Sequence, residues 1–206
     1  MRGRSSDGSG ESYDSVGFLT RSDNGTLQGL GSFLSKPEKP LGLSIYSRWI
    51  PEKPDHGQWY LNISYQLFDN FRAGLDYRPL TEDFGVIANW RVFPESDDWR
   101  PALVLGSSND DFGNINSQSI YGTFSKYLFE VMNVGFSVYG GATYIEALND
   151  LRPVGGLHLR REAWTAMFMY SGVDEHLTLA RELGNHTVSF ILFDLELPGL
   201  AYGFRF

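Results

Sequence analysis

The side chains that most clearly suggest a chemical function in this sequence are arginines that alternate with apolar residues. If each segment around them is a strand, successive side chains point to opposite faces, and the arginines share the polar face. Rings of arginine select anions. The pattern therefore predicts an anion-binding surface, whose candidates are Arg48, Arg72, Asp76, Arg78, Arg91, His158, Arg160 and Arg205.

Other chemistry finds little support in the sequence. The four histidines are scattered, and no two of them have the spacing of a metal site. Serine-nucleophile motifs and phosphate-binding glycine loops are absent from the sequence. We therefore expect no metal, no cofactor and no catalytic residues.

The segments that would position the arginines alternate with a period of two. The first clear ones span residues 41–49, 59–67, 71–78 and 84–93, and each has one apolar and one polar face. Segments of eight to ten residues joined by short turns are typical of a membrane β-barrel. Less regular segments follow after residue 100, and the chain closes with a hairpin that is expected to turn near Leu197–Gly199. The sequence therefore predicts an all-β, antiparallel, up-and-down transmembrane barrel of about 12 strands, in a range of 10 to 14.

The last residues of the chain carry a more specific pattern. Leu200, Tyr202, Phe204 and Phe206 share one face, and the chain stops on the aromatic. This ending resembles that of outer-membrane barrels, which close on a strand with aromatic residues at such positions. The resemblance implies that these four side chains face lipid and that the barrel-assembly machinery of the bacterial outer membrane recognises them.

Composition narrows the function classes. The net charge of −8 and the pI near 4.9 argue against nucleic acid as a partner. No run of 18 or more apolar residues is present, so strands are the only expected way to span a bilayer. The first residues contain no apolar signal-peptide region, and we expect that the export signal of an outer-membrane protein is missing from this chain.

The domain organisation is simple. Residues 1–12 are rich in Gly and Ser and are expected to be disordered. Residues 13–206 are expected to form the barrel, with 13–40 as an N-terminal hairpin or extension. A soluble β-sandwich or lipocalin-like barrel remains open at this point, because it alternates with the same period and turns its apolar face inward.

Four phrases, at residues 73–79, 99–108, 124–126 and 198–206, resemble the YjbH-like outer-membrane proteins of exopolysaccharide biosynthesis. The resemblance implies a role in making or exporting an extracellular polysaccharide, although this chain is much shorter than full-length members. The expected function is passage or anchoring of an anionic exopolysaccharide through an arginine-lined lumen. The alternatives are a structural or binding barrel without transport, in which loop carboxylates pair with the arginines, and an outer-membrane lipid hydrolase that uses His186.

Overall fold

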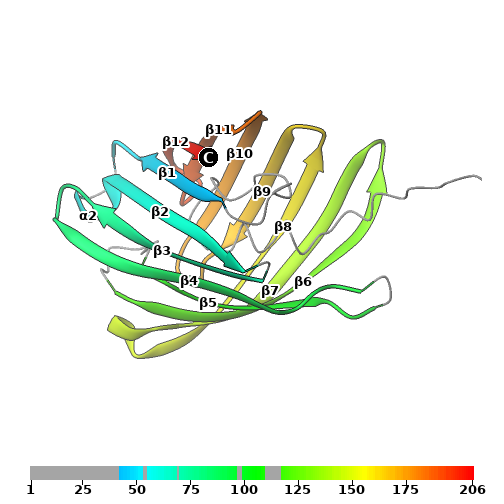
Figure 1. The fold of residues 1–206 in the computed structure, drawn as a ribbon, viewed down its shortest axis with the longest axis horizontal. Helices are drawn as coiled ribbons and strands as arrows, with labels where there is room; N and C mark the ends of the chain where they lie inside the picture. Colours follow the sequence, from blue (N-terminus) through cyan, green and yellow to red (C-terminus); the bar gives the residue numbers. More distant parts are fainter. Residues whose placement is uncertain (1–41, 53–54, 69, 97–98, 110–116) are drawn as a thin grey trace, which may run out of the picture.

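A computed structural model describes residues 42–206, except for 53–54, 69, 97–98 and 110–116. Twelve strands fill most of this part of the chain (Figure 1). They are β1 (Leu43–Trp49), β2 (Trp59–Phe68), β3 (Phe71–Arg78), β4 (Asp83–Phe93), β5 (Ala102–Ser108), β6 (Ser119–Val131), β7 (Val134–Ile145), β8 (Asp150–Arg161), β9 (Trp164–Tyr170), β10 (Glu175–Leu183), β11 (His186–Phe193) and β12 (Leu197–Arg205). A four-residue helix, α2 (Asp55–Gln58), and a 3₁₀ turn, η2 (Glu146–Leu148), lie between strands, and no helix in the described part is long and apolar enough to cross a membrane.

The strands form one closed barrel. Each pairs antiparallel with its neighbours along the chain, and β1 pairs with β12 to close the sheet, with Ser44 opposite Arg205 and Trp49 opposite Leu200. This confirms the predicted all-β, up-and-down architecture and the predicted strand number. The segments predicted at 1–12 and 13–40 lie outside the described residues, and the described strands close the barrel by themselves.

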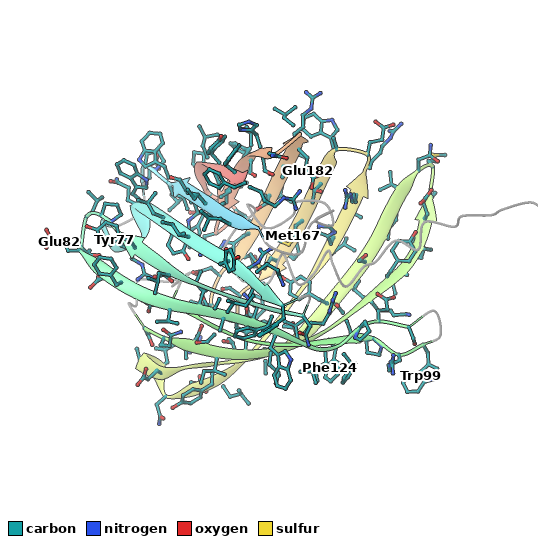
Figure 2. All side chains as sticks on the ribbon, in the orientation of Figure 1. Tyr77, Glu82, Trp99, Phe124, Met167 and Glu182 are labelled. Carbon is teal, nitrogen blue, oxygen red and sulfur yellow. The ribbon has the colours of Figure 1, made fainter. Side chains whose placement is uncertain are left out.

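Polar side chains point into the barrel, and large apolar side chains point out of it. On β2, Ser64 is 5% exposed while its neighbour Ile63 is 52% exposed. Figure 2 shows the same contrast between Phe124 on the outer surface and Met167 inside the barrel. A lipocalin-like barrel has the opposite arrangement, with its apolar face turned inward.

The two ends of the barrel differ in their connections. We call the end where β1 begins and β12 finishes the terminal end, and the opposite end the loop end. At the terminal end, β6–β7, β8–β9 and β10–β11 are joined by two residues each. Met132 and Asn133 have φ of 53° and 60°, as tight hairpin turns require, and Gly184 has φ of 64°.

The last hairpin turns at a different place from the one predicted. Its turn lies at residues 194–196, where Asp194 and Leu195 have φ of 51° and 53°, and Leu197–Gly199 already belong to β12. Gly199 instead allows close packing, because a Cβ at this position would lie 2.7 Å from Ile50 Cγ1. Close packing of β12 against the segment after β1 therefore explains a residue that in sequence indicates a turn.

Tyrosine rings fill the space above glycines on the inner wall. Tyr121 lies directly opposite Gly106 and covers it, and Tyr139 does the same to Gly156, where an added Cβ would lie 2.7 Å from the ring. These pairs let large rings lie flat against the sheet. Other buried side chains, among them Ile50, Met167 and Phe193, form an apolar cluster within the barrel.

Candidate anion-binding interior

The first group of predicted residues lies inside the barrel toward the loop end. Arg48 on β1 stacks on Tyr60 of β2, with its Cζ 5.0 Å from the ring centroid. The Tyr60 hydroxyl is 3.5 Å from Asp76 Oδ2 on β3, at the limit of a hydrogen bond. Arg78 lies two residues further along β3, with its Nη1 3.0 Å from the side-chain amide of Asn109. The amide accepts a hydrogen bond from Arg78 when it is assigned with its oxygen toward this nitrogen.

This loop-end group is almost sealed from solvent. Arg48 and Arg78 are each 2% exposed, and Asp76 is 1% exposed. Buried charges persist only when opposite charges and hydrogen bonds compensate their loss of hydration. Asp76 is the only carboxylate among the most buried described residues, whereas Arg48, Arg72 and Arg78 are all in that set. The buried charge of the described interior is therefore positive on balance.

A second group lies inside the barrel toward the terminal end. Arg72 on β3 donates from Nε to Gln66 Oε1 at 3.0 Å, and it lies near enough to Arg205 of β12 for the two charges to repel. Glu182 on β10 attracts Arg205, and its Oε2 is 3.6 Å from Arg160 Nη2 on β8. Arg160 and Arg205 thus share one carboxylate, and Arg72 lies near Arg205.

The remaining predicted interior residues are His158 and Arg91. His158 on β8 is fully buried between the positions of Ser137 on β7 and Met167 on β9. Arg91 is half-buried near the terminal end of β4, where its backbone N–H donates to Asn70 O at 2.8 Å. Six of the eight predicted residues therefore fall into two groups rather than one ring.

The four C-terminal residues predicted to face lipid do point outward. Leu200, Tyr202 and Phe206 are 55%, 46% and 65% exposed. Phe204 is half-buried because Phe206 packs edge-on against it, with 4.7 Å between ring centroids, and His186 packs against it at 4.8 Å.

The residues of the lipid-hydrolase alternative are not brought together. His186 lies on the outer wall, where its Nδ1 is 2.6 Å from the Tyr202 hydroxyl, whereas Ser189 is 2% exposed and faces the interior. The two side chains are on opposite faces of β11. Among the described residues, no group of three or more His, Asp or Glu side chains is placed to hold a metal ion.

Sequence reasoning missed three contributors to the interior. They are Tyr60, Asn109 and Glu182, none of which is among the predicted site residues. Glu182 lies next to the last residue of β10, Leu183. The alternation of Thr178, Ala180 and Glu182 with leucines was the available signal.

The interior arginines are candidates for binding an anion. Guanidinium groups carry fixed charge and directional donors suited to carboxylates and phosphates. Comparison of the sequence with protein-family models and with curated proteins finds no match.

Proposed function

We propose that this chain is an integral barrel of the bacterial outer membrane. The observation that carries the proposal is the reversed polarity of the wall, which exposes large apolar side chains all around the barrel and buries the polar ones. An apolar surface this extensive on a protein in water would drive association, whereas lipid solvates it. The closed sheet also satisfies the backbone hydrogen bonds that lipid cannot.

Aromatic side chains at both ends of the outer wall support this location. Trp and Tyr are enriched where a membrane protein crosses the lipid–water interfaces. The loop end carries Trp49, Trp59, Tyr77, Phe84 and Tyr144, and the terminal end carries Phe68, Trp90, Phe129, Trp164, Tyr202 and Phe206. Leucine, isoleucine and valine predominate between the two belts, for example Ile63, Leu75, Val86 and Leu179.

The turn lengths support one orientation in the membrane. Outer-membrane barrels have short turns on the periplasmic side and longer loops outside. The two-residue turns of this chain lie at the terminal end, which we assign to the periplasm. The loop end would then face the cell exterior.

Within this barrel, we propose that the inward arginines serve passage or anchoring of an anionic envelope polymer, such as an acidic exopolysaccharide. Support comes from the two interior groups, in which Arg48, Arg72 and Arg78 outnumber buried carboxylates. A polyuronate chain carries one carboxylate per sugar and suits several arginines spaced along a lumen.

One observation favours a binding barrel without transport as the second candidate. The loop-end arginines are almost fully buried, and apolar side chains such as Ile50 and Phe193 fill part of the interior. A barrel with this interior holds an anionic segment more readily than it conducts a stream of ions.

Two measurements test the proposal. Passage predicts anion-selective conductance of the reconstituted barrel in planar bilayers, lowered when Arg72, Arg78 and Arg91 are changed to Gln. Anchoring predicts binding of polygalacturonate, but not of neutral dextran, to a barrel that does not conduct, with the same variant binding more weakly. A folded barrel that neither conducts anions nor distinguishes the two polymers would contradict both functions.

A further inference from the structure

Two arginines flank a tryptophan on the outer wall at the terminal end. Trp164, at the start of β9, lies directly opposite Arg161 of β8 on one side and Arg181 of β10 on the other. The Arg181 Cζ lies 5.1 Å from the centroid of the Trp164 ring, in a cation–π contact. We call these three residues the Arg–Trp–Arg row.

The charges of this row are not paired within the described part of the chain. Neither Arg161 nor Arg181 forms an ion pair there, including with Glu162 in the turn between β8 and β9. The adjacent Arg160 and Glu182 point into the barrel, where they pair with each other at 3.6 Å. The two exposed guanidiniums can therefore bind an anionic group from outside the chain.

The next outward row toward the middle of the wall is apolar and uneven. Leu159, Ala166 and Leu179 lie opposite one another on β8, β9 and β10. The small Ala166 lies between two leucines, so this row has its smallest side chain on the strand that carries Trp164. A hydrocarbon chain could lie there while its polar end reaches the row.

We propose that the Arg–Trp–Arg row binds the phosphate of an anionic glycerophospholipid, with an acyl chain along Ala166. This inference rests on the proposed membrane location, which places the terminal end at the periplasmic leaflet. Charged side chains are unfavourable deep in a lipid-facing wall but favourable where they meet headgroups. Arg181 is held in position by Trp164, and each guanidinium offers paired donors to phosphate oxygens.

A second cation at the same end provides a matched control. The Arg100 Cζ lies 5.7 Å from the centroid of the Phe93 ring, so this arginine also pairs with an aromatic side chain. The difference is that, among the described residues, no second arginine flanks that ring. Lys126 is a poorer control because Glu95 already neutralises it, with 2.9 Å between Nζ and Oε1.

The test is native mass spectrometry of the folded full chain in micelles doped with equal amounts of phosphatidylglycerol and phosphatidylcholine. The wild type is expected to retain phosphatidylglycerol preferentially. In the double variant Arg161→Gln/Arg181→Gln this preference should fall about 30-fold, since each arginine near anionic lipid raises the affinity roughly fivefold. Arg100→Gln should keep the wild-type preference.

Insertion into phosphatidylcholine vesicles separates the two proposals. Failure of the wild type to insert would overturn the membrane location itself. Normal insertion, with equal phosphatidylglycerol preference in the wild type and the double variant, would overturn the lipid site alone. An equal loss in Arg100→Gln would mean that general surface charge, rather than the row, attracts the lipid, and would also overturn the site.

Discussion

An arginine placed in the middle of the outer wall should destabilise the barrel strongly, and the same residue placed at its rim should not. Leu75 lies in the middle of β3, is 59% exposed and points outward between Ile63 and Val86 of the neighbouring strands. Leu80 follows the same strand in the loop-end turn and is 48% exposed. The two leucines have similar exposure but different expected depths in a bilayer.

The expected magnitudes follow from that depth. An arginine on the lipid face costs about 2–4 kcal/mol near the bilayer midplane and about 0–1 kcal/mol near the interface. Leu75→Arg should therefore lower the free energy of unfolding by an amount that changes the folding equilibrium about 30- to 1,000-fold, while Leu80→Arg should change it less than tenfold. In water, an arginine at an exposed leucine would have little effect at either site.

The assay is urea-driven unfolding from phosphatidylcholine vesicles, followed by tryptophan fluorescence, for the wild type and the two variants. Leu75→Ala serves as a further control, because it removes the same side chain without adding charge. Equal stability of Leu75→Arg and Leu80→Arg would refute the reasoning that the outer wall is solvated by lipid.

Two further predictions concern the interior. Gly106→Val should destabilise the barrel by about 1–3 kcal/mol, because the valine side chain would overlap the Tyr121 ring. Gly140 faces outward, and a Cβ added there would have its nearest neighbour at 3.9 Å. Gly140→Val should therefore change stability by less than about 0.5 kcal/mol in the same urea titration. Glu182→Gln should increase anion selectivity in the bilayer reversal potential, because it removes the carboxylate that pairs with Arg160 and attracts Arg205. Unchanged selectivity would mean that permeant ions do not pass this carboxylate.

Much of the fold could be predicted because the two faces of a strand follow directly from the alternation of apolar and polar residues in the sequence. On β3, Phe71, Ala73, Leu75 and Tyr77 alternate with Arg72, Gly74, Asp76 and Arg78, and the structure keeps this division. The period does not say which face is inside, since a soluble barrel and a lipid-facing one obey the same rule. Only closure of the sheet, with Asp76 inside and Leu75 outside, decides it.

The grouping of the candidate site could not be predicted, because it depends on register between strands. Arg48 and Asp76 share a neighbour only because Tyr60 of β2 lies opposite Arg48 and reaches Asp76. Glu182 joins Arg160 through a strand whose end the sequence does not mark. The Pro198–Gly199 pair is misleading in sequence because its glycine allows close packing against Ile50 rather than a turn.

Vesicle flotation is the most direct measurement of the central claim that this barrel turns its apolar face to lipid. The chain refolded with phosphatidylcholine vesicles is expected to float with them in a sucrose gradient and to stay bound after washing with alkaline carbonate. It is also expected to aggregate in buffer that contains no detergent or lipid. A chain that stays a folded monomer in that buffer, and remains at the bottom of the gradient, would contradict the claim.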